Sequence, residues 1–411
     1  MLVHVLFSLP VLLAIGLAVD ANQDGFELET LASPASGNCA FPNLARGADG
    51  KTYLSWIERG EENFGVMRLS VLEENGWGKP SEVVRGTDLF LNWADFPSVC
   101  ALKDGTLLAQ WLRSGADPHG YSAEFSISSD GGEHWSAPKK LHDDLSSVEH
   151  GFVSVAPWNG SDANTFGAIW LDGRASVGKE HGAGETALYF RTISAKGELG
   201  PEQVLDSRVC DCCQTSLVAE SGGGLVATYR DRSAEEVRDI SLVRFDGESW
   251  SKPKRVHADE WLIDGCPVNG PRASNANGLS AVAWFTGVGG GGGSVRVAFR
   301  KGEWYGAPFD IDEGRPVGRV DLVFLAGDTV LVSWMEYAGE GRADWRVRTV
   351  SREGKLGASI KVGEVPSDRA SGYLRMVTAG DDVVLTWTTP EPEWQIETAR
   401  LRARKELPDR D

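Results

Sequence analysis

Basic residues are scarce in this 411-residue chain. It holds 41 Lys and Arg against 59 Asp and Glu, a formal net charge of −18, and the basic residues form no stripe along the sequence. Proteins that bind nucleic acids neutralise phosphates with such stripes. We therefore expect no nucleic-acid partner.

Long apolar runs are also scarce. One run, residues 2–19, is too short for a comfortable membrane span, and small residues around Ala18 and Ala21 follow it. This pattern predicts a signal peptide over residues 1–21 and a periplasmic or secreted protein that is not held at a membrane after cleavage. No Lys or Arg precedes Arg46, so an uncleaved anchor is the alternative.

A repeat dominates the rest of the sequence. Seven short apolar runs each end in an aromatic residue, at intervals of 50 to 59 residues: Trp56, Trp111, Trp170, Tyr229, Trp284, Trp334 and Trp387. A period of this length, whose unit contains several short strands, is typical of the blades of a β-propeller. We predict an all-β, seven-bladed β-propeller with almost no helix; a six-bladed ring is the alternative.

The seventh repeat has no fourth strand of its own. A spare strand, GFELETL from Gly25, precedes the first repeat, and we expect it to complete the last blade beside the strand that follows Trp394. Closure of this kind removes the open edges of an incomplete blade. The repeats fill residues 22–405 as one domain, and residues 406–411 are expected to form a disordered tail.

A turn motif occurs in the second repeat. The segment SSDGGEHW has Ser128, Asp130, Gly132 and Trp135 at the spacing of an Asp-box, and it falls between the third and fourth strands. This turn lies on the face opposite the starts of the innermost strands. We expect Asp130 to accept hydrogen bonds from its own turn and Trp135 to pack between sheets, which is a folding role.

The Asp-box and the propeller period together resemble the sialidase-like superfamily, whose members are propellers with such boxes and which includes exo-acting glycoside hydrolases. Longer segments, NWADFP (92–97) and CPVNGP (266–271), resemble bacterial exported proteins of the sialidase family. The resemblance implies a propeller with an active site at the channel mouth. Two departures are visible. Catalytic sialidases have six blades, and the Arg-Ile-Pro pattern of the first blade, which supplies one arginine for carboxylate binding, is here Ala40-Phe41-Pro42.

Other arginines could replace the missing one. The segment TYRDRSAEEVRDIS places Arg230 and Arg238 around a hairpin of the fourth repeat, and Arg319 begins the sixth. Guanidinium groups bind carboxylates through paired hydrogen bonds. We predict that these arginines, with Asn92 and Asn269, bind an acidic ligand; an internal ion-pair network is the alternative.

Candidate catalytic residues follow from the resemblance. Sialidases use a tyrosine assisted by a carboxylate, and an aspartic acid, so we consider Asp95, Tyr229 and Glu149. Asp95 could equally cap the turn of NWADFP, and Tyr229 could serve only in core packing.

Three cysteines lie within four residues. Cys210, Cys212 and Cys213 are expected to meet Cys266 of the next repeat at one rim. Disulfides, a strained bridge between adjacent cysteines, and a thiolate site for a soft metal all remain open, and an exported location favours disulfides. We expect no other cofactor.

Two functions are consistent with these observations. The first is an exported propeller that hydrolyses or binds an acidic carbohydrate, with glycoside hydrolysis of the exo-α-sialidase type as the activity. The second is a non-catalytic propeller that binds a ligand or another exported protein, with a structural or metal-holding cysteine cluster. Fold alone does not choose between them.

Overall fold

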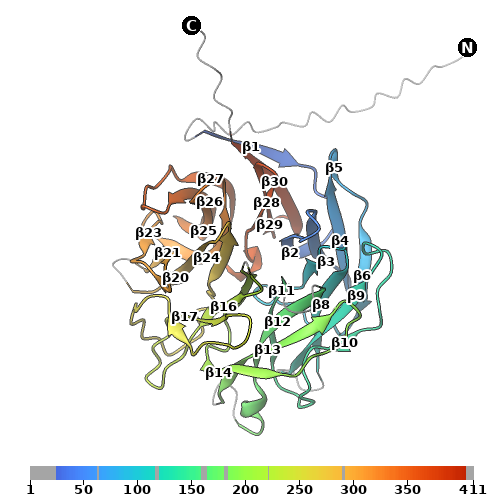
Figure 1. The fold of residues 1–411 in the computed structure, drawn as a ribbon. Coiled ribbons are helices and arrows are strands. Elements are labelled where there is room, and N and C mark those ends of the chain that lie inside the picture. The colour runs from blue at the N-terminus through green and yellow to red at the C-terminus, as the bar shows by residue number, and fades with distance from the viewer. Residues whose placement is uncertain are drawn as a thin grey trace, which may run out of the picture.

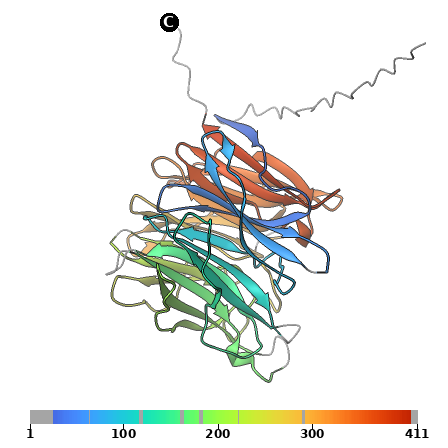
Figure 2. The same cartoon turned by 90° about the vertical axis from the view of Figure 1, so that its right-hand side faces the viewer.

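The computed structural model describes residues 25–403 except residue 63, segments 116–119, 159–163 and 180–183, residue 221 and segment 289–291. The predicted signal peptide (1–21) and tail (406–411) lie outside the described residues. Seven antiparallel sheets surround a central channel, as the axial view in Figure 1 and the side view in Figure 2 show. The prediction of a seven-bladed propeller is confirmed.

In each of the first four blades the main strands run in chain order from the innermost outward. Blade 1 contains β2 (Cys39–Arg46), β3 (Thr52–Arg59), β4 (Gly65–Glu73) and β6 (Ser81–Gly86), with the short β5 (Gly76–Trp77) extending β4. Blade 2 contains β7 (Ser98–Ala101), β8 (Leu107–Ser114), β9 (Tyr121–Ser128) and β10 (Lys139–Lys140). Blade 3 contains β11 (His150–Trp158), β12 (Thr165–Asp172), β13 (Thr186–Ser194) and β14 (Gln203–Val209). Blade 4 contains β15 (Ser216–Ala219), β16 (Leu225–Arg230), β17 (Ile240–Phe245) and β18 (Lys254–Arg255).

The last three blades follow the same order, except that the N-terminal strand is the outermost one of blade 7. Blade 5 contains β19 (Arg272–Ala276), β20 (Leu279–Thr286), β21 (Ser294–Lys301) and β23 (Phe309–Asp310), with β22 (Trp304–Tyr305) extending β21. Blade 6 contains β24 (Pro316–Phe324), β25 (Thr329–Gly339), β26 (Arg342–Ser351) and β27 (Ile360–Pro366). Blade 7 contains β28 (Arg375–Ala379), β29 (Asp382–Thr389), β30 (Gln395–Ala403) and β1 (Phe26–Leu31).

The N-terminal strand closes the ring. β1 pairs with β30 from Phe26 opposite Ala403 to Leu31 opposite Thr398, and the two strands lie side by side in Figure 1. The innermost strands also contact one another in sequence around the channel, with β28 returning to β2. The predicted closure of the last blade is therefore confirmed.

The repeated aromatic residues form the cores between blades. All seven lie in the second strand of a blade and are buried, from Trp56 (0% exposed) to Trp387 (8%). Each sheet is covered on both faces by its neighbours, so these strands are apolar along most of their length and rich in β-branched residues. β25, for example, is buried from Val330 to Glu336.

Asp-Gly turns join the first two strands of blades 1 and 2. Gly50 (φ 84°) and Gly105 (φ 86°) adopt left-handed backbone conformations that favour glycine. The preceding Asp49 and Asp104 each accept the amide of the residue two positions on, at 3.0 Å. These local contacts explain why the first strand of each blade ends in a turn at these residues.

Helix is confined to two 3-10 turns among the described residues, η1 (Arg174–Ser176) and η2 (Arg369–Ser371). None of the described helices has the length and apolar character that a membrane crossing requires.

Candidate functional site

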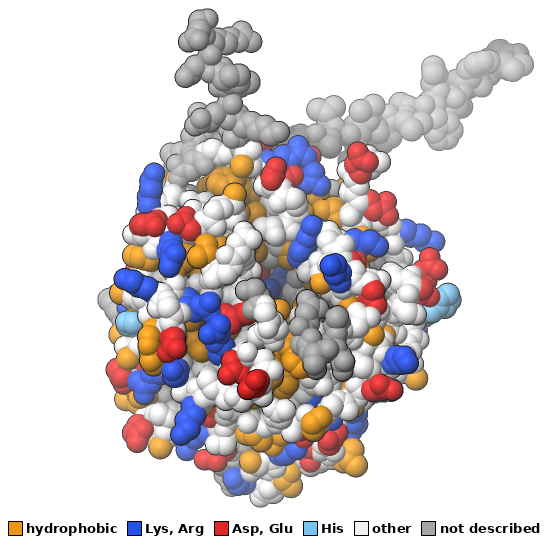
Figure 3. Space-filling model, viewed as in Figure 1, with side chains coloured by type: hydrophobic (Ala, Val, Ile, Leu, Met, Phe, Trp, Pro, Cys, Tyr) orange, Lys and Arg blue, Asp and Glu red, His pale blue; other side chains and the backbone are white. Residues whose placement is uncertain are grey.

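A cavity follows the central channel. Its volume is about 400 Å³, and residues of the innermost strands of all seven blades line it. Many of the lining side chains are hydroxyls and amides, including Asn43, Ser98, Ser154, Thr215 and Asn275. The space-filling view in Figure 3 has a hollow near the centre of the face, with acidic and basic side chains interspersed around it.

Two arginines give the cavity a positive charge. Arg272 Nε lies 2.9 Å from Asp321 Oδ1, and Arg375 Nη1 lies 3.9 Å from Asp321 Oδ2. Arg375 Nε has no hydrogen-bond partner among the described residues. Burial lowers the pKa of Arg375 to about 10, and its guanidinium group stands over the rings of Phe96 and Tyr373. Two cations therefore share one carboxylate beside the cavity.

Sequence reasoning missed both of these arginines, although a signal was present. Successive side chains of a strand alternate between its faces, so some residues of an innermost strand must face the channel. Arg272 and Arg375 each begin an innermost strand. An arginine at the start of an innermost strand is therefore a candidate for a cation that faces the channel.

Asp95 also lines the cavity. It is 4% exposed, and its Oδ2 accepts the amide of Phe152 at 2.7 Å. Burial is the main reason that its pKa is raised to about 7; the hydrogen bond from Phe152 opposes this rise, and the charge of Glu149 adds to it. The structure thus brings together Asp95 and Glu149, two of the three predicted catalytic residues.

The contact between Asp95 and Phe152 joins blade 2 to blade 3, and a neutral residue makes the same contact elsewhere. Asn269 Oδ1 accepts the amide of Arg319 at 2.6 Å, which joins blade 5 to blade 6. Both acceptors lie against a glycine, Gly151 and Gly318, at which an added Cβ would overlap the acceptor side chain. We call this contact the interblade clamp. Because the neutral Asn269 makes the same contact, the side chain of Asp95 can join two blades whether or not it is ionised.

The third predicted catalytic residue, Tyr229, lies apart from this group. It is 1% exposed in the core between blades, and its hydroxyl donates to Asp206 Oδ2 at 2.7 Å. Burial raises its pKa, with Asp206 adding to the effect. These contacts correspond to the core-packing alternative.

Another tyrosine, which the sequence reasoning missed, lies beside Asp95. Tyr121 is 6% exposed and stacks on Phe90 with the ring centroids 4.3 Å apart. Burial raises its pKa well above the ordinary value, and the nearby charges of Asp95 and Glu149 add to this rise. Its position at the start of β9, on a hairpin beside the channel mouth, was the available signal.

Arg230 holds two blades together. Its side chain is 1% exposed and donates to the carbonyl oxygens of Asn269, Arg238 and Phe285, at 2.6 to 3.1 Å. It also stands over the ring of Trp261. The guanidinium group therefore serves blade packing in this structure and does not face the cavity.

The other predicted ligand-binding residues are engaged as well. Arg238 is 3% exposed and pairs with Glu236 at 2.8 Å, as the ion-pair alternative expects. Arg319 is 5% exposed; it donates to Gly372 O at 3.0 Å, and burial lowers its pKa to about 10. Asn92 Oδ1 accepts the amide of Ala94 at 2.8 Å within its own turn.

The cysteines of blade 4 form a compact group. Cys210 Sγ lies 3.5 Å from Cys213 Sγ and 3.8 Å from Cys212 Sγ, and Cys266 Sγ lies 3.6 Å from the carboxylate of Asp211. The contacts of Cys210 with Cys212 and Cys213 lower the pKa of Cys210 well below its ordinary value. No disulfide joins any of the six cysteines in this structure, all of which lie among the described residues.

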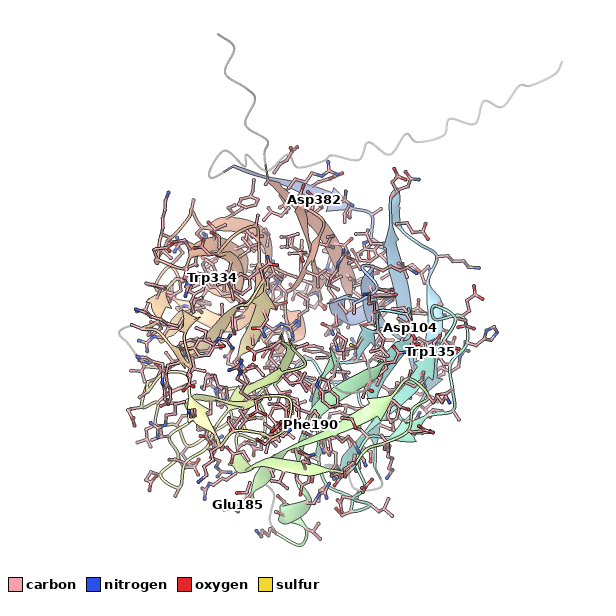
Figure 4. All side chains as sticks on the ribbon, viewed as in Figure 1. Asp104, Trp135, Glu185, Phe190, Trp334 and Asp382 are labelled. Atoms are coloured by element: carbon pink, nitrogen blue, oxygen red, sulfur yellow. The ribbon has the colours of Figure 1, made fainter. Side chains whose placement is uncertain are left out.

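The Asp-box turn makes the contacts of a folding element. Asp130 Oδ1 accepts the amides of Glu133 at 3.1 Å and His134 at 3.0 Å, and Gly132 N donates to Ser128 Oγ at 2.9 Å. Trp135, labelled in Figure 4, packs against a buried cluster of blades 1 and 2. The turn joins β9 to β10, at the end of the blade away from the starts of the innermost strands.

Comparisons with solved structures agree on the fold. The chain resembles the BP39L lectin from Burkholderia pseudomallei (TM-score 0.60, 13% identity, 88% of this chain and 95% of the lectin). It also resembles a Dyadobacter fermentans protein of unknown function (TM-score 0.55, 13% identity, 92% and 100%) and the GH93 α-L-arabinofuranosidase of Fusarium graminearum in complex with arabinobiose (TM-score 0.50, 14% identity, 91% and 97%). No curated protein matches the sequence at a significant level.

The family assignment comes from the sequence itself. Residues 60–283, more than half of the chain, match the model of the BNR repeat-like domain. The resemblance to sialidases that the Asp-box and the repeat indicated is therefore confirmed at the level of the family. The chain belongs to the BNR repeat-like family of the sialidase-like superfamily, a family of propellers whose fold is shared with glycoside hydrolases.

Proposed function

We propose that the chain binds an acidic carbohydrate in its central channel, with Arg272 and Arg375 as the groups that hold the ligand's carboxylate. The observation that carries this proposal is the charge of the cavity, where two guanidinium groups share the single carboxylate of Asp321 and Arg375 Nε has no hydrogen-bond partner among the described residues. Guanidinium groups form paired, charge-assisted hydrogen bonds with carboxylates. These arginines would replace the ones that we expected from the sequence.

The rest of the cavity suits a sugar. A volume of about 400 Å³ lies within the range of about 300–1,000 Å³ that is typical of small-molecule sites. Hydroxyl and amide side chains such as Ser98, Ser154 and Asn275 can exchange hydrogen bonds with sugar hydroxyls, and Phe96 offers an apolar surface. A single sugar ring with a carboxylate is the ligand class that this lining favours.

The finer proposal is hydrolysis of a terminal acidic sugar, an activity of the exo-α-sialidase type. Asp95 would be the acid that protonates the leaving oxygen, because its pKa of about 7 keeps it protonated in mildly acidic solution. Glu149 is the neighbouring carboxylate. We further propose a periplasmic or secreted location, which rests on the apolar run at residues 2–19.

Binding without hydrolysis is a second candidate. The interblade clamp favours it, because Asp95 already accepts the amide of Phe152 and Asn269 fills the same role without any acid. In that case the channel would hold its ligand and release it unchanged.

Calorimetric titration with N-acetylneuraminic acid tests the binding proposal. We expect Arg272→Ala and Arg375→Ala each to weaken binding by roughly 10- to 100-fold, the loss expected for hydrogen bonds to a charged group. Arg352→Ala, at an exposed position outside the cavity, is the matched control. Equal affinity in the wild type and both cavity variants would rule out the channel arginines, with a thermal melt of each variant to establish that it is folded.

Turnover of a fluorogenic α-sialoside separates the two candidates. Asp95→Asn preserves an amide oxygen for the clamp and removes the acid, so a hydrolase loses its turnover and retains its binding. No turnover by a wild-type protein that binds the sugar would leave binding as the function.

A further inference from the structure

The cysteine group of blade 4 has the dimensions of a metal site. The sulfur atoms of Cys210, Cys212 and Cys213 all lie within 4.8 Å of one another, with separations of 3.5 and 3.8 Å from Cys210. Four sulfurs around a zinc ion at about 2.3 Å lie about 3.8 Å apart. A disulfide would require about 2.05 Å. The observed spacing therefore matches thiolates around one ion.

A fourth thiol lies on the outer side of this group. The sulfurs of Cys212 and Cys266 and a carboxylate oxygen of Asp211 also lie within 4.8 Å of one another. Cys210 (1% exposed) and Cys213 (2%) are buried, Cys212 is partly buried and Cys266 is exposed. An ion could thus reach the buried sulfurs by way of Cys266.

A buried cation supports negative charge on the cysteines. Arg238 Nη1 donates to Cys210 Sγ at 3.4 Å and lies 3.8 Å from the carboxylate of Asp211. Groups that hydrogen-bond to metal ligands orient them and offset their charge. Arg238, which the sequence suggested as a ligand-binding residue, is in place for this role.

We propose that Cys210, Cys212 and Cys213 bind a soft closed-shell cation, Zn(II) or Cu(I), with Cys266 as the available fourth thiolate. Thiolates select these ions because both are soft acceptors without a strong geometric preference. Binding releases the thiol protons to solvent, and no electron transfer is needed. The site is separate from the channel arginines, so it does not depend on the proposed function.

Disulfide formation is the competing outcome. Cys212 and Cys213 are adjacent, and a bridge between neighbouring residues is strained. Pairing of Cys210 with Cys213 would leave Cys212 beside Cys266. Either arrangement consumes the sulfurs that the metal needs.

The test uses the full chain, reduced and kept without oxygen, to which Zn(II) or Cu(I) is added alone. After desalting, we expect about one ion per protein, as in other single-ion thiolate sites, and an ultraviolet charge-transfer band for the copper form. Cys213→Ser should reduce the affinity for the ion by roughly tenfold or more. Cys100→Ala is the matched control, since Cys100 is a buried thiol outside the group (8% exposed) and should leave the stoichiometry unchanged.

Cys266→Ser tests whether Cys266 is a fourth ligand of the bound ion. A four-coordinate zinc site loses affinity in this variant, whereas a three-coordinate copper site does not. The proposal is overturned if the reduced wild type retains neither ion, or if Cys213→Ser retains as much as the wild type. Circular dichroism checks that Cys213→Ser is folded, and the partly buried Cys212→Ser replaces it if it is not.

Discussion

Arg230 and Arg272 show how surroundings decide what an arginine does. Arg230 is buried and donates hydrogen bonds to three backbone carbonyls. Arg272 lies beside the cavity, with its side chain 32% exposed and one carboxylate as its partner. In the sequence both are arginines in or next to a strand. Only the packing of the next blade distinguishes a structural cation from one that can meet a ligand.

The first prediction at this scale concerns Arg230. Arg230→Ala leaves carbonyls of Asn269, Arg238 and Phe285 without their donor, and we expect a loss of roughly 3–5 kcal/mol in the free energy of unfolding. Denaturant titration measures it, with Arg352→Ala as the exposed control. A loss below about 1 kcal/mol would mean that these contacts contribute little to stability.

The second prediction concerns the pH dependence of Asp95. Its pKa is about 7 in the folded protein and about 3.9 in the unfolded chain, so the stability that the protonated acid contributes is lost as the pH rises from about 4 to 7. Asp95→Asn does not titrate and retains the interblade clamp. Its free energy of unfolding relative to the wild type should rise by as much as about 4 kcal/mol over that range. Denaturant titrations at pH 4.5 and 7.5 measure this difference, and parallel pH profiles would contradict it.

The strands owe their positions to patterns that the sequence displays. The repeated apolar runs that end in an aromatic residue predicted the blades, and the spare strand from Gly25 predicted the role of β1. The outer edges of two blades differ from the expectation. In blade 1 the short β5 precedes the outer strand β6, and β22 stands in the same relation to β23 in blade 5. A two-residue strand is too short for a period to reveal.

Strand β1 is the subject of the third prediction. Deleting residues 25–31 leaves β30 with an open edge, which is a template for pairing with other chains. We expect the midpoint of thermal unfolding to fall by at least about 5 °C and the variant to self-associate. Light scattering and a thermal melt measure both. Adding the peptide GFELETL should restore a monomer, and a deletion variant that stays monomeric with an unchanged midpoint would show that β1 is dispensable.

For the whole molecule, the repeat predicted the architecture, and the repeat with the Asp-box indicated the superfamily, but neither predicted the site. The period places every blade because each aromatic residue is buried in the second strand of its blade. The charged residues beside the cavity do not recur from repeat to repeat. They are Arg272 in blade 5, Asp321 in blade 6 and Arg375 in blade 7. These residues, about fifty positions apart in the sequence, meet only when the three consecutive blades pack against one another. This also explains how a chain with a net charge of −18 can line its channel with cations.

The pairing of the first and last strands sets a limit on the order of events during synthesis. Thr398 Oγ1 donates to Leu31 O across a separation of 367 residues. At about 5–20 residues per second, a ribosome takes roughly 20 to 70 s to make the chain between them. For that time β1 lacks its partner, so the last blade forms only after β30 has been synthesised, and the other six blades remain an open arc until then.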